Sequence, residues 1–344
     1  MLITFLDKNY KYDGSTIKIK PLDGALKSVI LLSEALASIG HIVRVYNNCN
    51  ETKVINKVSW QKIDNFDASH SDVWVVHNDP NLLDLIPSND KKILWLTSSG
   101  LKLARPENFS IIMKHKPTLI IQGEYHINSI PEGLKSLDAT IIPTGQSDYF
   151  INNEDLFPSV TPKALVTTHP LMGLDWIIDI WNKYIHTKLP WAELHIYSYS
   201  LHKALLGENL PEVYDDIIEK VKQSLTHNIK INLPKIDKEM IEEIKDIRVH
   251  LYPSHKFEVS AFSLSETQAL GMPAIVRPLG AATEKIYNGK TGFIAENEKL
   301  FSEYVIKLLS DLTYFKSVNK ECKSLKLGRD WNKVAEEFIQ VFKS

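Results

Sequence analysis

Length, composition and charge limit the classes of protein to which this chain can belong. It has 344 residues, of which 44% are hydrophobic and 24% charged, and its net charge is −2. This is typical of a globular chain long enough for two domains, and it gives no general electrostatic reason to bind nucleic acid. Cys49 and Cys322 are too few and too far apart for a disulfide framework or a cysteine zinc site, which predicts a reducing cytoplasm.

The chain begins with an apolar segment that we interpret as a first strand. Residues 1–6 run directly into Asp7 and Lys8, without the basic start or the small-residue cleavage site of a signal peptide. No apolar run approaches the roughly 20 residues that cross a bilayer. A weak contact between a helix of the N-terminal domain and the inner face of a membrane is kept as an alternative, because a protein of low net charge can still carry a local charged patch.

Short apolar runs then alternate with helical patterns almost throughout. Most runs are rich in Ile, Val and Leu with little alternation, which is typical of parallel strands covered on both faces. The expected strands are Leu2–Leu6, Ile42–Tyr46, Val73–His77, Ile93–Thr97, Thr118–Ile121, Thr140–Ile142, Ala164–Thr168, Glu193–Tyr197, Ile229–Leu233, Val249–Tyr252 and Ala274–Arg277.

The helical patterns between these runs are amphipathic. Residues 25–39 place Val29, Leu32 and Leu36 on one face before Gly40 ends the pattern. Similar patterns occupy Asp175–Tyr184, Asp237–Lys245 and, at the end of the chain, Trp331–Phe342. The alternation of strands and helices predicts a doubly wound α/β architecture.

The best candidate boundary is the polar segment 152–162, which carries two prolines and separates two series of strands. We therefore expect two Rossmann-like domains facing across a cleft. Residues 1–155 would form the N-terminal domain and 156–328 the C-terminal domain. Residues 329–344 would form a C-terminal helix that must dock against another part of the protein.

Two glutamates, Glu258 and Glu266, stand eight positions apart after the strand Val249–Tyr252. A helix is expected to run through Leu270 and to stop at Gly271, so Glu258 falls at the strand-to-helix turn. The free N–H groups at the start of this helix can bind phosphate. Carboxylates can accept hydrogen bonds from sugar hydroxyls, so the combination predicts a site for a nucleotide-sugar.

These residues carry a resemblance to a known family. The C-terminal half resembles the retaining, GT-B-fold glycosyltransferases of family 4, also called glycosyltransferases group 1. The matching segments are Tyr252–Ser254, Glu258 with Glu266, Gln268–Pro273, Gly280 with Glu284, and Asn288–Phe293. Fainter matches are Pro21–Ala25, Gly40–Val45, Ile142–Gly145 with Phe150, Thr168–Asp175 and Glu193–Ile196. Only the block 249–293 is specific enough to indicate this family without the other matches.

The resemblance implies roles for individual residues. Glu258 would act as the catalytic residue that faces the donor sugar, and Glu266 would bind the ribose hydroxyls. Backbone amides would hold the diphosphate, with Gly173 nearby, and the acceptor would lie beside the start of the first helix. The resemblance also implies that the last helix, in residues 329–344, packs back towards the N-terminal domain. The amides belong to Val259, Ser260, Ala261 and Phe262, and the acceptor-side residues are Gly24 and Ala25.

This sequence departs from the family pattern at several places. Basic residues usual in the family are replaced by Thr167 and Met172, a histidine by Thr97, and a glycine by Ala261. The sequence does not say whether the missing basic residues impair catalysis. Lys256, Lys203 or Arg277 could supply part of the missing charge for the donor phosphates.

Two further acceptor-side candidates follow from the expected strands. His77 ends one strand, and Thr97 and Ser98 end the next, at the edge where ligands bind in α/β sheets. His77 could contact the acceptor or serve as a structural turn residue. Thr97 and Ser98 could line the same edge or belong to a plain loop with a helix cap.

The function expected from these observations is that of a metal-independent, cytoplasmic hexosyltransferase. It would move a sugar from a UDP- or GDP-sugar to a glycan or glycolipid with retention of configuration, and it would need no other cofactor. No Asp-x-Asp metal clamp occurs in the chain. The main alternative is a non-catalytic relative that binds nucleotide or glycan or partners an active transferase. A sugar-nucleotide epimerase is a second enzymatic alternative, which the glutamate pair disfavours.

Overall fold

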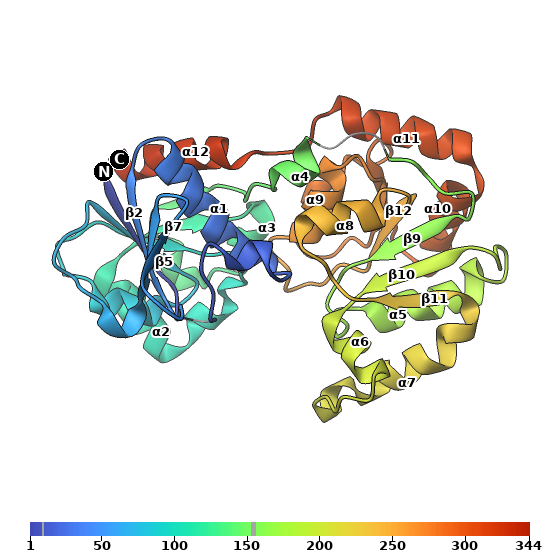
Figure 1. The fold of residues 1–344 in the computed structure, drawn as a ribbon, viewed down its shortest axis with the longest axis horizontal. Coiled ribbons are helices and arrows are strands. Elements are labelled where there is room, and N and C mark those ends of the chain that lie inside the picture. The colour runs from blue at the N-terminus through green and yellow to red at the C-terminus, as the bar shows by residue number, and fades with distance from the viewer. Residues whose placement is uncertain (9, 153–155) are drawn as a thin grey trace. The chain divides into compact units, whose positions relative to one another are not determined.

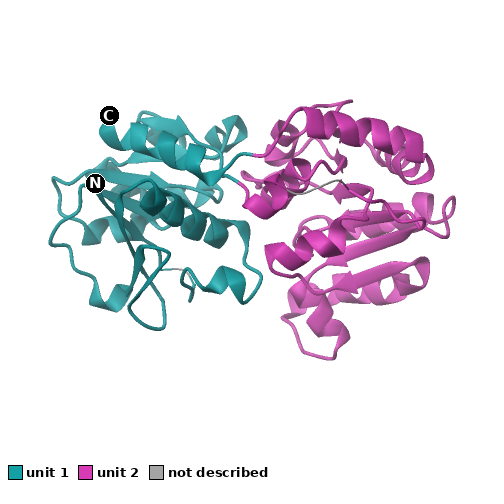
Figure 2. Ribbon diagram, turned by 45° about the horizontal axis from the view of Figure 1, so that its top comes forward, with its two compact units in different colours: residues 1–145, 329–344 teal, residues 146–328 magenta. Residues whose placement is uncertain are grey.

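The computed structural model describes residues 1–8, 10–152 and 156–344. The chain forms two compact units, one of residues 1–145 with 329–344 and the other of residues 146–328 (Figure 2). Each unit is built around one sheet of parallel strands with helices on its faces (Figure 1). This is the two-domain α/β architecture predicted from the alternation of strands and helices.

The sheet of the first unit has the strand order β3-β4-β2-β1-β5-β6-β7-β8 within the described residues. All neighbours pair in parallel except β3 and β4, which are antiparallel. The strands are β1 (Leu2–Leu6), β2 (Ile42–Asn47), β3 (Lys53–Ile55), β4 (Val58–Lys62), β5 (Val73–His77), β6 (Lys92–Trp95), β7 (Thr118–Ile121) and β8 (Ala139–Ile141). Its α-helices are α1 (Gly24–Ser38), α2 (Pro106–His115), α3 (Glu124–Ile127) and α12 (Trp331–Lys343).

Both faces of this sheet are buried, which explains the continuous apolar runs in the sequence. Phe5 belongs to the hydrophobic cluster that includes α1 and α12, whereas Leu6, the next residue of β1, belongs to the cluster on the opposite face. Successive side chains of a strand point to opposite faces, so a strand covered on both faces needs apolar residues at nearly every position.

The C-terminal helix confirms the predicted return to the first unit. α12 lies along α1 (Figure 1), and the ring centroids of Phe338 and Trp95 are 5.3 Å apart in an edge-to-face contact. The side chain of Asp330 accepts a hydrogen bond from Lys333 N at 2.8 Å and caps the helix. The stripe predicted from the sequence, which includes Val334, is buried here.

The sheet of the second unit is parallel throughout, with the order β11-β10-β9-β12-β13-β14. The strands are β9 (Lys163–Val166), β10 (Glu193–Tyr197), β11 (Ile229–Asn232), β12 (Val249–Tyr252), β13 (Ala274–Val276) and β14 (Gly292–Ile294). The α-helices are α4 (Asp148–Ile151), α5 (Leu174–Ile180), α6 (Tyr199–Leu205), α7 (Asp215–Ser224), α8 (Asp237–Ile244), α9 (Phe262–Ala269), α10 (Glu298–Ser310) and α11 (Leu312–Ser324).

Short helices connect many of these elements. The 3₁₀-helices are η1 (Thr16–Lys18), η2 (Ile63–Asn65), η3 (Pro80–Leu85), η4 (Gly100–Ala104), η5 (Glu132–Leu134), η7 (Glu212–Tyr214), η8 (Leu225–His227) and η9 (Gly280–Lys285). The predicted helix Asp175–Tyr184 is α5 followed by a π-helical turn, η6 (Trp181–Ile185).

Two features differ from the sequence prediction. The first unit ends at Gly145 rather than at residue 155, because α4 packs against α8 and α9 of the second unit. Residues 153–155 of the predicted linker lie outside the described residues. The hairpin β3–β4 was not predicted. Asn56 and Lys57 form its turn with positive φ angles of 48° and 67°. The Asn-Gly pair that usually marks such a turn in a sequence is absent, because lysine occupies the glycine position.

Candidate functional site

The loop between β12 and α9 carries Glu258 at the carboxyl edge of the second sheet. Its backbone N–H donates to His255 O at 3.0 Å, and its carbonyl accepts from Ala281 N at 2.9 Å. Gly280 makes this contact between loops possible. It has a φ of +61°, and a Cβ there would lie 2.3 Å from His255 O and 2.9 Å from Glu258 O. The backbone of η9 therefore supports the loop that presents Glu258.

Glu258 is half-buried, and its carboxyl group is hydrogen-bonded. The hydroxyl of Tyr252, a residue 2% exposed on β12, donates to Glu258 Oε1. Burial raises the pKa of Glu258 to about 7, while the bond from Tyr252 and the positive charge of Lys285 act in the opposite direction. A carboxyl group with this pKa can hold or release a proton near neutral pH.

The start of α9 has an unusual cap. Ala261, the N-cap residue, has left-handed backbone angles (φ 47°, ψ 50°) that favour glycine. The first N–H groups of an α-helix have no partner within the helix and attract anions. Val259, Ser260 and Ala261 are buried, and Phe262 is half-buried. The structure therefore brings the predicted amides to the end of β12, next to Glu258.

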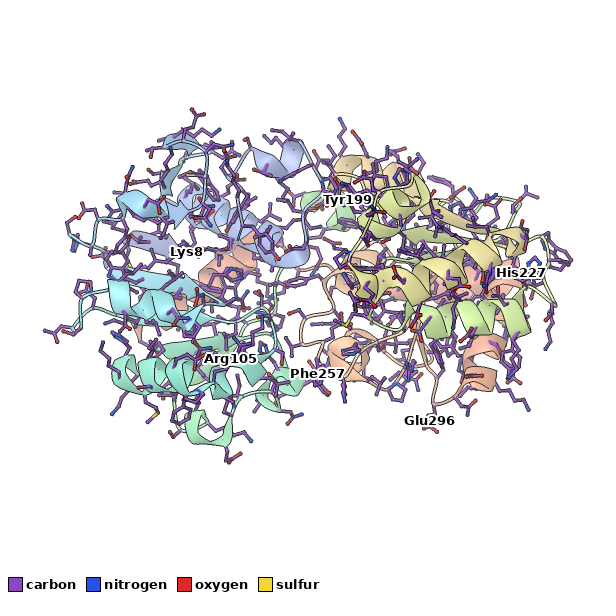
Figure 3. The ribbon with its side chains drawn as sticks, turned by 90° about the horizontal axis from the view of Figure 1, so that it is seen from below. Lys8, Arg105, Tyr199, His227, Phe257 and Glu296 are labelled. Atoms are coloured by element: carbon purple, nitrogen blue, oxygen red, sulfur yellow. The ribbon has the colours of Figure 1, made fainter. Side chains whose placement is uncertain are left out.

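Glu266 lies one helical turn after the start of α9 and is half-buried, so it does not point into a sealed interior. Phe257, the neighbour of Glu258 in the chain, is 50% exposed and is labelled in Figure 3. The two glutamates and the start of α9 thus occupy one partly exposed edge of the second unit.

The three candidate cations have different surroundings. Lys203 Nζ lies 2.7 Å from Glu208 Oε2 and is also near the ring of Tyr199. Lys256 Nζ lies 4.9 Å from the ring centroid of Phe257. The guanidinium of Arg277, just after β13, lies 4.5 Å from the ring centroid of Trp176 on α5. The ion pair makes Lys203 the least available of the three for a phosphate.

Gly173 precedes α5 with a φ of +87°, and a Cβ there would lie 2.9 Å from Pro253 Cβ. The turn after β9 can therefore lie close to the end of β12. Met172 is 40% exposed. Thr167, which also departs from the family pattern, has its hydroxyl within 3.0 Å of His250 Nε2 and donates to Ser263 Oγ at 2.8 Å.

In the first unit, Gly24 and Ala25 form the first turn of α1 and are half-buried. Asp23 caps this helix, because its carboxylate accepts from Leu26 N at 2.9 Å. The predicted acceptor residues at this turn thus lie at a well-formed helix start. The acceptor role of this turn stays a prediction.

His77, Thr97 and Ser98 come together at the carboxyl ends of β5 and β6, but their exposure differs. His77 and Thr97 are 1% and 4% exposed, and His77 Nε2 lies 2.9 Å from Thr97 Oγ1. His77 Nδ1 lies 3.1 Å from a carboxylate oxygen of the buried Asp7. Ser98 is exposed and donates to Asn78 Oδ1 at 3.1 Å. The geometry gives His77 and Thr97 interior hydrogen bonds and leaves Ser98 at the surface.

Sequence reasoning missed several polar residues near Glu258. Tyr252 and His250 fall within a strand that was interpreted as buried, and neither was given a role at the site, although Tyr252 belongs to a segment that resembles the family. The signal available was their alternation, because residues two apart on a strand share a face. Lys285 was also missed, and nothing in its local sequence distinguishes it. Among residues 1–8, 10–152 and 156–344, no group of three or more His, Cys, Asp or Glu is placed to hold a metal ion.

The fold is that of the GT-B glycosyltransferases. Sucrose-phosphate synthase from Thermosynechococcus elongatus superposes with a TM-score of 0.75 at 12% identity, covering 99% of this chain and 98% of that one. Anabaena HepE, solved with UDP and glucose, superposes with a TM-score of 0.69 at 11% identity, covering 99% of each chain. Likeness at such low identity defines the fold alone.

Sequence comparison matches part of the second unit to a family. Residues 204–324 match the family described as glycosyl transferases group 1. The capsular polysaccharide biosynthesis glycosyltransferase CapM of Staphylococcus aureus is 31% identical over 102 residues, which are 29% of this chain and 27% of CapM. The aligned part therefore spans about a quarter of that relative. The family match includes Glu258, Glu266, Gly280 and the whole of α9.

Proposed function

We propose that this protein is a glycosyltransferase that moves a sugar from a nucleotide diphosphate sugar to a hydroxyl group of a glycan or glycolipid. The observation that carries the proposal is the half-buried Glu258, whose carboxyl group accepts from Tyr252 next to the start of α9, at the carboxyl edge of a parallel sheet. Ligands of open α/β sheets bind at this edge.

The comparisons support the same class of reaction. The family match covers the segment that holds both glutamates, and the partial relative CapM acts in capsular polysaccharide biosynthesis. A fold neighbour, HepE, was solved with UDP and glucose. We therefore propose a UDP- or GDP-hexose as donor and a surface glycan or its lipid-linked precursor as acceptor.

In the proposed reaction the donor binds to the second unit. Glu258 faces the sugar near the bond that breaks, Glu266 accepts hydrogen bonds from the ribose, and the amides of residues 259–262 bind the diphosphate. Gly173 allows the β9–α5 turn to approach the phosphates, and Arg277 or Lys256 adds positive charge. Stabilising charge on the leaving diphosphate is the main catalytic task, and fixed dipoles and cations can perform it without a metal ion.

The acceptor is proposed to bind to the first unit, beside Gly24, Ala25 and the exposed Ser98. His77 and Thr97 would support this surface from the interior. We propose transfer with retention of the anomeric configuration. We also propose a cytoplasmic reaction at or near the inner face of a membrane, and the two buried free cysteines, Cys49 and Cys322, support a reducing compartment. None of the described helices is long and apolar enough to span a bilayer.

The test uses Glu258→Gln, which keeps the shape of the side chain and removes its charge. The variant should bind UDP or GDP like the wild type in calorimetry but lose sugar transfer by about 10³-fold. Glu303→Gln, at an exposed position on α10, is the matched control and should keep full activity. Full turnover by the Glu258→Gln variant would contradict the proposed role of Glu258.

A second candidate is a non-catalytic relative that binds a nucleotide or glycan, or that partners an active transferase. The observation that favours it is the absence of basic side chains at Thr167 and Met172, where the resembling family carries them. Calorimetry with UDP and GDP, combined with donor hydrolysis and transfer assays, separates the two. Tight nucleotide binding with no turnover on a panel of donors would support this second candidate.

A further inference from the structure

A continuous chain of hydrogen bonds runs through the second unit and ends at Glu258. It begins at Thr267 on α9, whose hydroxyl lies 2.8 Å from His250 Nδ1. His250 Nε2 lies 3.0 Å from Thr167 Oγ1, and the Thr167 hydroxyl donates to Ser263 Oγ at 2.8 Å. Ser263 then acts on the Tyr252 hydroxyl, where its hydrogen bond lowers the pKa of Tyr252 against the larger raising effect of burial, and the Tyr252 hydroxyl donates to Glu258.

The chemistry of these groups sets the direction of the chain. Burial lowers the pKa of His250 to about 3, so one ring nitrogen donates and the other accepts at neutral pH. Thr167 gives its single proton to Ser263, so His250 Nε2–H donates to Thr167. His250 Nδ1 then accepts from Thr267, which shares its single hydroxyl proton with Leu264 O, 3.1 Å from Thr267 Oγ1. Each donor therefore points along the chain towards the carboxylate.

We propose that Tyr252 is a positioning residue. Its hydroxyl connects this ordered series of hydrogen bonds to Glu258 and holds the Glu258 carboxylate in one orientation and charge state. The proposal rests on the proposed function, because it takes Glu258 as the carboxylate that faces the sugar. It also explains the threonine at position 167. A hydroxyl there both accepts and donates, which continues the chain, whereas a lysine or arginine could only donate.

The other charged groups around Glu258 have separate roles. Lys285, on η9, acts on Glu258 through its charge. On the loop itself, the His255 ring packs on Phe257, with ring centroids 5.3 Å apart, and the ammonium of Lys256 lies over the same Phe257 ring. Tyr252 is thus the group that donates to the Glu258 carboxylate from β12, and it does so from a buried position.

The experiment removes the tyrosine hydroxyl and follows the titration of Glu258 directly. Tyr252→Phe should raise the midpoint of the Glu258 carboxyl ¹³C resonance by about one pH unit, because a bond to the charged form is lost. Glu258→Gln assigns the resonance. Tyr197→Phe is the matched control, because the Tyr197 hydroxyl also donates to a glutamate, Glu243, at 3.2 Å, and this variant should leave the midpoint unchanged.

Ser263→Ala provides a second variant that keeps the tyrosine ring in place. It should raise the same midpoint by a smaller amount, and the acidic limb of kcat/KM should follow the midpoint in both variants. An unchanged midpoint in Tyr252→Phe would overturn the inference even if transfer activity is found. If no nucleoside diphosphate binds to the wild type, the proposed function fails, and the carboxyl titration still reports on the chain of hydrogen bonds.

Discussion

The two units carry comparable polar networks at the carboxyl edges of their sheets, but the acids in these networks differ in how exposed they are. In the first unit, the buried carboxylate of Asp7 accepts from Tyr12 at 2.7 Å and contacts His77, which leads to Thr97 and Asn78. Every group from Asp7 to Thr97 lies in the interior, and the network reaches the surface through the half-buried Asn78 and the exposed Ser98.

In the second unit, the network starts at the buried His250 and ends at the half-buried Glu258. An acid that lies in the interior, such as Asp7, stabilises a fold by accepting hydrogen bonds from buried donors. A network that ends at a partly exposed acid can set the charge of a group that meets a ligand. The contrast teaches that the exposure of the acid, more than the presence of histidine or acid, distinguishes a candidate site from a structural network.

The largest expected effect comes from breaking the support of Glu258. Gly280→Ala should destabilise the protein by about 3 kcal/mol and reduce transfer more than 100-fold, because the new Cβ meets two backbone carbonyls and the backbone needs positive φ. Denaturant unfolding and a transfer assay measure the two effects. Gly289→Ala, at φ +81° with nothing within 4 Å, tests backbone strain alone and should cost about 1 kcal/mol.

The buried acid of the first unit, Asp7, predicts a loss of stability without a loss of nucleotide binding. Asp7→Ala should destabilise by about 2–3 kcal/mol, because buried donors of Tyr12 and His77 lose their acceptor. UDP affinity in calorimetry should stay within twofold of the wild type. Asp67→Ala, at an exposed turn where Asp67 accepts from Ser69, should change stability by less than about 0.5 kcal/mol. A strong loss of UDP affinity in Asp7→Ala would make the comparison of the two networks wrong.

Glu258, at the end of the second network, predicts that the stability of the folded protein depends on pH. The pKa of Glu258 in the folded protein is about 7, above its ordinary value of 4.5, so the folded state binds more protons than the unfolded state between these values. Its contribution to stability is present below pH 4.5 and is lost as the pH rises through 7. Glu258→Gln should therefore stabilise by on the order of 2 kcal/mol at pH 8 and little at pH 4.5. Thermal unfolding at both pH values measures this, and equal shifts would contradict it.

The smallest expected effect sharpens the description of the α9 cap. Ala261→Gly should stabilise by about 1 kcal/mol, because glycine adopts the left-handed angles of this position without steric cost. Ala35→Gly, inside α1, should destabilise by a similar amount, since that position is helical. Chemical denaturation gives both values. A destabilised Ala261→Gly variant would show that the alanine side chain makes contacts worth more than the strain.

The sequence alone determined the local elements and the pair of glutamates. Val73–His77, Thr118–Ile121, Glu193–Tyr197 and Val249–Tyr252 were predicted with the bounds that the structure shows, because apolar runs and stop signals act over a few residues. Glu258 and Glu266 were found because strand, turn and helix start follow one another directly in the chain. The return of α12 to the first unit was also expected from its apolar stripe, together with the family resemblance.

The tertiary structure alone decided which distant groups meet. Thr167 bonds to His250 and Ser263, which lie 83 and 96 positions away, and Asp7 contacts His77 across 70 positions. Gly280 supports Glu258 because η9 follows the strand that pairs with β12. Such contacts depend on strand order and register, which periodicity does not encode. The physical reason is that local propensity acts along the chain, whereas a hydrogen-bond network forms between chain segments that only packing brings together.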